Sequence, residues 1–185
     1  NIYEREFANC ANETAYCTPY TLLRLLADLV PNMPDKLLYL DIDMMANGDI
    51  SPLYHTDIEE YEYAAVKEKY GSKMIRPDYI NAGMLLLNMK KIKETKLLEK
   101  ARELIKRKKL LFADQDAIFW NTTKKKLLPR KYNEQASFNR KDTVICHFCK
   151  RLLWLPYPHT ENYKQWNIEE IHKYLKCYTF DKDLE

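Results

Sequence analysis

Glycine is scarce in this chain, with 3 glycines in 185 residues, whereas proteins average ~7%. Each glycine therefore needs a local explanation, and Gly48 sits in an Asn-Gly-Asp sequence that favours a turn. Long apolar runs are absent as well. No stretch approaches the ~20 consecutive apolar residues that a membrane-spanning helix needs, and we find no secretory signal, internal repeat or low-complexity segment.

The chain also lacks a strong charge of either sign. Its 30 Lys and Arg and 27 Asp and Glu leave a net charge of +3, which is not expected of a dedicated nucleic-acid-binding protein. The basic residues do gather in two runs, at 106–109 and 124–126. Such runs are usually solvated helix ends and loops. The alternative is a face for an anionic acceptor or membrane surface.

Cysteine is present in an odd number, 5, which favours reduced thiols in a cytoplasmic protein. Cys146 and Cys149 form a C-x-x-C pattern, which could be half of a zinc site or a redox pair. A structural zinc site usually has a second close pair, and a redox pair usually begins a helix. Neither condition is met, so we favour cysteines of a core strand and keep the zinc or redox module as an alternative.

Apolar patterning predicts a soluble domain in which strands alternate with helices, which is typical of the α/β class. Residues 3–16 are polar and irregular and are interpreted as a loop. Thr18 is expected to cap a helix that begins at Pro19 and ends near Leu29. Further helices are expected at 97–110, where Leu111 extends the apolar side, at 114–121 and at 168–176, and strands at 36–40, which we expect to be buried on both faces, 63–66, 84–87 and 144–148.

Asp41 and Asp43 follow directly on the first of these strands. In an extended chain, residues i and i+2 point to the same side, so the two carboxylates would be presented together if the strand continues. Two close carboxylates repel each other unless a cation lies between them, and oxygen ligands suit Mg²⁺ or Mn²⁺. The alternative is a pair of solvated acids at a strand-to-loop junction.

Several segments, in order, resemble those of glycosyltransferase family 8, which includes bacterial lipopolysaccharide galactosyltransferases and glycogenin. Residues 38–43, which end with Asp41 and Asp43, and the residues at 48–54 that follow are similar to the family's signature segment. Residues 81–88 resemble its second signature, Asp114-Gln115-Asp116 its third and His147-Phe148 the start of its fourth, and 18–31 is similar to the helix before the first.

The resemblance implies a GT-A fold, an α/β arrangement with a central mixed sheet flanked by helices. It also implies transfer of glucose or galactose from UDP-glucose or UDP-galactose to a saccharide or lipid-linked acceptor, with retention of anomeric configuration. Asp41, Asp43 and His147 would bind Mn²⁺, with Mg²⁺ as the alternative. For His147 by itself, a buried structural histidine is the usual interpretation.

The same resemblance assigns residues to the donor sugar. Asn81 and Ala82 would line its pocket, and Gly83 would allow the backbone to approach it closely. Arg24 would reach the donor or its phosphate; alternatively, it forms an exposed pair with Asp28.

The third signature supplies the residues expected beside the anomeric carbon. Asp114 would bind sugar hydroxyls, and Gln115 would lie near the face where a nucleophile would stand. Because an amide is a poor nucleophile, we favour front-face attack by the acceptor over a double displacement, which would require a carboxylate.

The sequence departs from the family pattern at two places. The opening strand that holds the uridine has no counterpart before Arg24, so we expect 1–155 to be an N-terminally incomplete GT-A domain. The fourth signature lacks its Lys-Pro-Trp, and Lys150 or Arg151 would supply the phosphate-binding cation. A non-catalytic nucleotide-sugar- or carbohydrate-binding relative is therefore the alternative function.

The C-terminal residues 156–185 are expected to form a separate helical extension rich in aromatic and basic residues. Aromatic residues are mixed with lysines over 152–180, from Trp154 onward, and the plain interpretation is that they pack against the main sheet. The alternative is a peripheral contact with the inner face of a membrane, where Trp and Tyr settle at headgroup depth.

Overall fold

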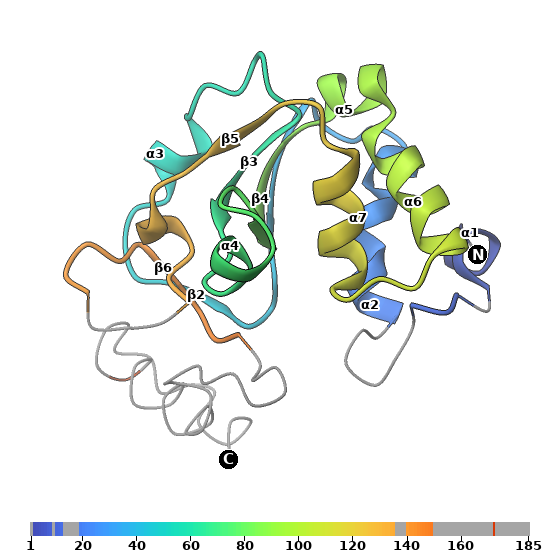
Figure 1. Cartoon of the computed structure of the whole chain (residues 1–185). Helices are drawn as coiled ribbons and strands as arrows, with labels where there is room; N and C mark the ends of the chain where they lie inside the picture. The colour runs from blue at the N-terminus through green and yellow to red at the C-terminus, as the bar shows by residue number, and fades with distance from the viewer. Residues whose placement is uncertain (1, 9, 13–18, 136–139, 150–171, 173–185) are drawn as a thin grey trace. The chain divides into compact units, whose positions relative to one another are not determined.

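The computed structural model describes residues 2–8, 10–12, 19–135, 140–149 and 172 (Figure 1). The chain divides into two compact units, which are described separately. Unit 1 comprises Asn1–Tyr39 and Thr56–Leu128, and unit 2 comprises Leu40–His55 and Pro129–Glu185. The predicted cap Thr18 and all of the predicted helix 168–176 except residue 172 lie outside the described residues.

Unit 1 is built on a four-stranded sheet of order β1-β4-β3-β5. Strand β3 pairs antiparallel with β4 and parallel with β5, which confirms the predicted mixed sheet. The predicted strands correspond to β1 (Lys36–Leu40), β3 (Tyr63–Lys67) and β4 (Ile80–Asn88), while β5 (Lys125–Leu127) was not predicted. Strand β1 was expected to be buried on both faces but is half-buried throughout, because it lies at an edge of the sheet.

Seven helices of unit 1 are found among the described residues. Their bounds are α1 (Ile2–Phe7), α2 (Pro19–Leu22), η1 (Leu23–Leu29), α4 (Gly71–Met74), α5 (Met89–Thr95), α6 (Leu97–Arg107) and α7 (Ala113–Asn121). The loop predicted from residue 3 is wrong over α1, because Phe7 is buried in the core and Glu6 pairs with Lys106 at 3.0 Å.

The helix predicted from Pro19 to Leu29 has the expected extent, but its second part is a 3-10 helix. Leu22 and Leu25 are both fully buried. A 3-10 turn aligns residues three apart on one face, so it presents this pair to the core.

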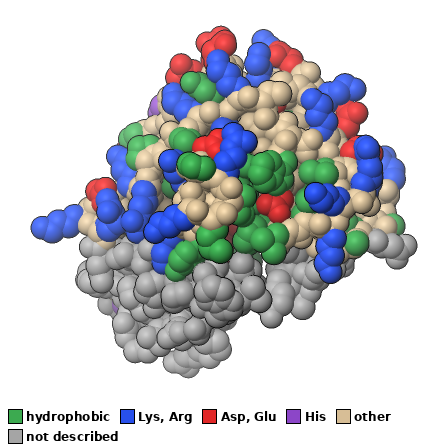
Figure 2. Space-filling model, viewed as in Figure 1, with side chains coloured by type: hydrophobic (Ala, Val, Ile, Leu, Met, Phe, Trp, Pro, Cys, Tyr) green, Lys and Arg blue, Asp and Glu red, His purple; other side chains and the backbone are tan. Residues whose placement is uncertain are grey.

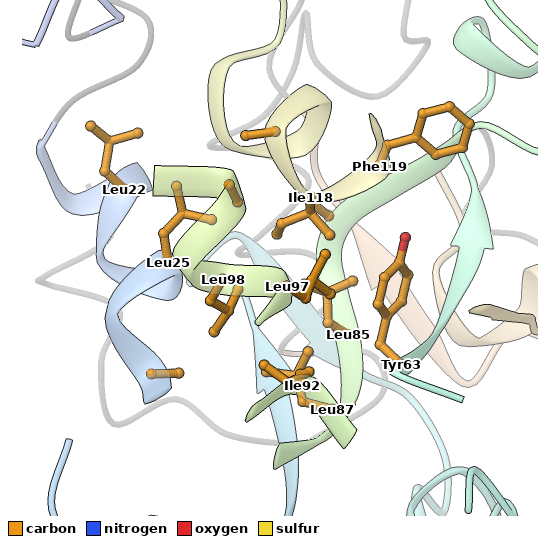
Figure 3. Close-up of a cluster of buried hydrophobic side chains, with 14 of the residues drawn as sticks. Leu22, Leu25, Tyr63, Leu85, Leu87, Ile92, Leu97, Leu98, Ile118 and Phe119 are labelled. Atoms are coloured by element: carbon orange, nitrogen blue, oxygen red, sulfur yellow. The ribbon is translucent and has the colours of Figure 1, made fainter. Parts of the chain in front are cut away.

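The core of unit 1 lies where the helices cover β4 (Figures 1 and 3). Leu97 and Leu98 of α6, Ile118 of α7 and Leu85 of β4 are each 1% exposed. Burial of one such side chain contributes roughly 1.5–3 kcal/mol. Leu111, predicted on the apolar side of α6, is 71% exposed because the helix ends at Arg107.

The structure explains why residue 71 is one of the few glycines of this chain. A Cβ at this position would lie 2.7 Å from Cε1 of the Tyr79 ring and 2.9 Å from a carboxylate oxygen of Glu68. Glycine therefore lets the backbone approach the buried Tyr79 side chain closely.

Unit 2 contains two short strands, a helical turn and a 3-10 turn among its described residues. Strand β2 (Met44–Ala46) pairs antiparallel with β6 (Ile145–His147), in the register Met44 to His147. The other elements are α3 (Ser51–Tyr54) and η2 (Arg130–Tyr132). The predicted strand at 144–148 is confirmed over β6, whereas β2 was not predicted. No helix among the described residues has the length and apolar character to span a membrane.

Candidate active site

Asp41, Asp43 and His147 come together in unit 2. One ligand atom of each lies within 4.8 Å of the others, and His147 Nε2 lies 3.3 Å from Asp43 Oδ1. Met44, the first residue of β2, pairs with His147, and this pairing places the preceding residue, Asp43, beside the imidazole. The amide of Phe148 also donates to the Asp43 carbonyl at 2.9 Å.

The backbone conformation that brings Asp41 and Asp43 together differs from the predicted extended strand. Strand β1 ends at Leu40, and the chain turns at residues 42 and 43 instead of staying extended. The turn leaves Ile42 fully exposed. Alternation along a strand therefore does not explain the pair; the turn between β1 and β2 does.

The donor atoms of this triad fit a divalent cation. Two half-buried carboxylates and a 4% exposed imidazole supply oxygen and nitrogen together, a mixed set that Mn²⁺ accepts more readily than Mg²⁺. Nδ1 of His147 is engaged by Asn133 Oδ1 at 3.0 Å, so Nε2 is the nitrogen that faces the acids. Sequence reasoning missed Asn133, because no local pattern links residues 133 and 147.

A second group of predicted residues comes together in unit 1. Arg24 Nε lies 3.0 Å from Asp114 Oδ2, with both side chains 6% exposed, and its Nη1 donates to the Ala82 carbonyl at 2.5 Å. The guanidinium also lies 4.6 Å from the centre of the Tyr39 ring. The alternative of an exposed pair with Asp28 is wrong, since Asp28 accepts from Arg102.

Strand β4 bulges where the second signature lies. Ile80 pairs with Lys67 and Leu85 with Ala65, so residues 81–84 stand opposite Val66 alone. In this bulge the Ala82 amide donates to Gln115 Oε1 at 2.9 Å and its carbonyl accepts from Arg24. Bulges of this kind often lie next to active sites, where they redirect the chain.

Asn81 and Gly83 share the same bulge. The Gly83 amide donates to the Asn81 side-chain oxygen at 3.0 Å, and Gly83 is buried. Their proposed contacts with a donor sugar, including the close approach at Gly83, stay predictions.

The third residue of the Asp-Gln-Asp signature binds the turn that leads into α7. Asp116 Oδ2 accepts from the amides of Leu111 and Phe112 at 3.0 Å each, and Oδ1 accepts from the Tyr79 hydroxyl at 2.5 Å. Burial, followed by this bond, raises the pKa of Tyr79. Ala113 begins α7 with φ 36°, a strained conformation for a residue with a side chain. Asp116 therefore holds the turn that orients the two signature residues before it.

The remaining predictions concern Lys150 and the cysteines. Lys150 lies outside the described residues. Cys146 and Cys149 are both buried, and in the described part of the chain they join no group of three potential metal ligands. Cys146 packs with Phe148, in agreement with the interpretation as core cysteines.

Two relatives of this chain are named as lipopolysaccharide sugar transferases. The chain is 36% identical over 112 residues to the lipopolysaccharide 1,2-glucosyltransferase of Escherichia coli, covering 54% of this chain and 33% of that protein. It is 26% identical over 171 residues to the lipopolysaccharide 1,3-galactosyltransferase of Salmonella typhimurium, covering 82% and 51%. The chain thus spans between a third and about half of these relatives.

Solved structures share the fold. The galactosyltransferase LgtC, in complex with donor and acceptor sugar analogs, superposes with a TM-score of 0.66 at 21% identity, covering 90% of this chain and 72% of LgtC. The glycosyltransferase GlyE of Streptococcus pneumoniae gives 0.62 at 22% identity, covering 89% and 46%. These similarities confirm the predicted GT-A fold.

The sequence model of one family matches nearly the whole chain, from residue 2 to residue 169. Both curated relatives are sugar transferases by name. The chain belongs to glycosyl transferase family 8.

Proposed function

We propose that this chain forms the catalytic part of a retaining, Mn²⁺-dependent transferase that moves glucose or galactose from a UDP-sugar to a saccharide or lipid-linked acceptor. The observation that carries the proposal is the convergence of Asp41, Asp43 and His147 within 4.8 Å, in a chain that belongs to a glycosyltransferase family. The curated relatives, named as glucosyl- and galactosyltransferases of lipopolysaccharide, support hexose transfer.

Asp41, Asp43 and His147 would hold the cation in unit 2. A bound cation supplies Lewis-acid stabilisation for the negative charge that builds on a diphosphate leaving group. The acids are half-buried and the neighbouring Ile42 is fully exposed, so the carboxylate side is open to solvent. Lys150 would add a phosphate-binding charge.

In unit 1, the residues around Ala82 would bind the donor sugar. The Arg24 ion pair fixes the Asp114 carboxylate, whose oxygens are suited to accept from sugar hydroxyls. Arg24 and Gln115 both bind the Ala82 backbone. They would therefore set the shape of the pocket wall that Asn81 and Ala82 contribute.

The contacts of Gln115 and Asp114 support front-face attack. Gln115 Oε1 already accepts the Ala82 amide proton, and an amide oxygen is a weak nucleophile. The Asp114 carboxylate is paired with Arg24 at 3.0 Å, which lowers its nucleophilicity. We therefore favour formation of the acceptor oxygen–C1 bond on the face where the C1–phosphate oxygen bond breaks, with the departing phosphate oxygen taking the proton.

The charged and aromatic surface residues bear on partners other than the sugar donor. Lys124 lies 3.6 Å from Glu60 and Lys125 lies 2.7 Å from Asp78, which supports a solvated, paired surface more than an anion-binding face. On the face drawn in Figure 2, Lys and Arg side chains are spread among other residues. The aromatic residues proposed for membrane contact, from 154 onward, lie outside the described residues.

The test is a thermal shift of the full chain with UDP and Mn²⁺, separately and together. A ligand at 100 times its Kd stabilises by roughly 2.7 kcal/mol, so a rise of several degrees is expected. Asp43→Asn should abolish the rise, whereas Asp49→Asn, an exposed acid of the same unit, should preserve it. No rise with any UDP-sugar and metal would refute the proposal.

Release of UDP then separates the enzyme from a non-catalytic relative. The full chain, with UDP-glucose or UDP-galactose and Mn²⁺, should liberate UDP slowly even without acceptor. Binding without release would instead favour the nucleotide-sugar-binding alternative.

A further inference from the structure

A buried asparagine lies against the side of the His147 ring that faces away from Asp43. His147 Nε2 is 3.3 Å from Asp43 Oδ1, and Nδ1 is 3.0 Å from Asn133 Oδ1. We propose that Asn133 is a positioning residue that keeps the ring proton of His147 on Nδ1, so that the Nε2 lone pair is directed at the acid pair. This inference rests on the proposed metal-binding role of the triad.

The chemistry of the two side chains carries this inference. An amide oxygen only accepts hydrogen bonds, and a neutral imidazole has a single N–H. If Asn133 Oδ1 accepts from Nδ1, the other ring nitrogen carries a lone pair, which is the form that binds a metal. The reverse orientation of the amide would move the ring proton to Nε2, where it would face Asp43 and block a cation.

The backbone fixes Asn133 beside the strand that carries His147. Asn133 directly follows η2, and its amide donates to the Arg130 carbonyl at 3.0 Å. The next amide, of Glu134, donates to Ile145 at 2.9 Å, and the His147 amide donates back to the Glu134 carbonyl at 3.0 Å. Bonds on both sides of Cys146 thus set the register between the asparagine and the imidazole.

Burial and charge stabilise the same segment. Asn133 and Glu134 are 0% exposed and His147 is 4% exposed, so water competes little for the amide or the ring. The Glu134 carboxylate pairs with Arg130 at 2.6 Å and with Arg140 at 3.4 Å. These ion pairs of Glu134 hold the backbone next to Asn133 in place. An asparagine side chain that is held in place can fix the orientation of the imidazole to which it is hydrogen-bonded.

The experiment reads the tautomer directly in the metal-free full chain. Ring nitrogens of ¹⁵N-histidine are observed by NMR in alkaline buffer, where a free imidazole is neutral. The His147 signals are identified by their loss in His147→Gln. We expect a protonated Nδ1 and an unprotonated Nε2 in the wild type. Asn133→Asp, which keeps an acceptor oxygen, should preserve this pattern, and Asn133→Leu should lose it.

Mn²⁺ affinity gives the second readout, by electron paramagnetic resonance of the free ion. Asn133→Leu should weaken binding by about 10–100-fold, the usual effect of removing a partner that orients a ligand, and Asn133→Asp by only a few-fold. A wild-type proton on Nε2, or a folded Asn133→Leu that matches the wild type in both readouts, would overturn the inference.

Failure of the proposed function would look different. If the wild type binds no Mn²⁺, the metal proposal fails, while the tautomer spectrum still supports or overturns the role of Asn133. If Asn133→Leu does not fold, the spectra of the wild type and Asn133→Asp decide: loss of the Nδ1 proton in either one counts against it.

Discussion

The ion pair between Arg24 and Asp114 gives the sharpest stability prediction. Both side chains are 6% exposed and their charged atoms lie 3.0 Å apart. Breaking a buried pair by removing one partner typically costs about 3–5 kcal/mol, because the other charge is left uncompensated. We expect Asp114→Asn and Arg24→Met each to lower the free energy of unfolding by this amount, or Tm by roughly 6–20 °C.

A double-mutant cycle measured by urea denaturation checks this reasoning. The Arg24→Met/Asp114→Asn double variant should lose about 2 kcal/mol less than the sum of the single losses, because neither charge is then left alone. Arg76→Met, at an exposed ion pair with Asp78, is the control and should cost about 1 kcal/mol or less. Single losses as small as the control, or strictly additive losses, would refute the idea that this pair holds the site together.

Three further predictions concern single positions. Asp116→Ala should lower the free energy of unfolding by about 2–3 kcal/mol in urea denaturation, because the amides of Leu111 and Phe112 and a buried tyrosine hydroxyl lose their acceptor. A loss below about 0.5 kcal/mol would count against this role of Asp116. Lys96→Gly should raise stability by about 0.5–1 kcal/mol, because Lys96 has φ 57°, whereas Lys93→Gly inside α5 should lower it. The Lys125 ammonium lowers the pKa of Asp78 below its ordinary value of 3.8, so the ionised carboxylate stabilises the fold above pH 3.8 and does so less as the pH falls further. Asp78→Asn should therefore be less stable than the wild type at neutral pH, and this difference in stability should disappear in acid. A difference that does not depend on pH would exclude the ion pair as its cause.

Much of the fold follows from local patterns in the sequence. The apolar run of β1 and the helical periodicity of α6 are strong signals, and both elements lie where they were expected. Strands β2 and β5 have three residues each, which is too few for alternation to show. Helix α1 was missed because its stability comes from remote contacts, such as Glu6 with Lys106.

The residues of the site also divide into those that a local sequence pattern identifies and those that depend on remote contacts. Family motifs named Asp41, Asp43 and His147, and the structure brings these three together. No motif named Asn133, and the third signature includes Asp116 but gave it no role. Their roles depend on His147 and Tyr79, which are 14 and 37 residues away. A polar residue whose partner is distant in sequence has no local signature, so only the fold shows what it does.

The central claim is that these three side chains bind one divalent cation beside a diphosphate. The most direct measurement is a crystal structure of the full chain with UDP and Mn²⁺, with diffraction recorded on both sides of the manganese absorption edge. The account predicts one anomalous peak within coordination distance of Asp41, Asp43 and His147 Nε2. UDP bound with no manganese peak at these atoms, or with a peak at other ligands, would contradict it.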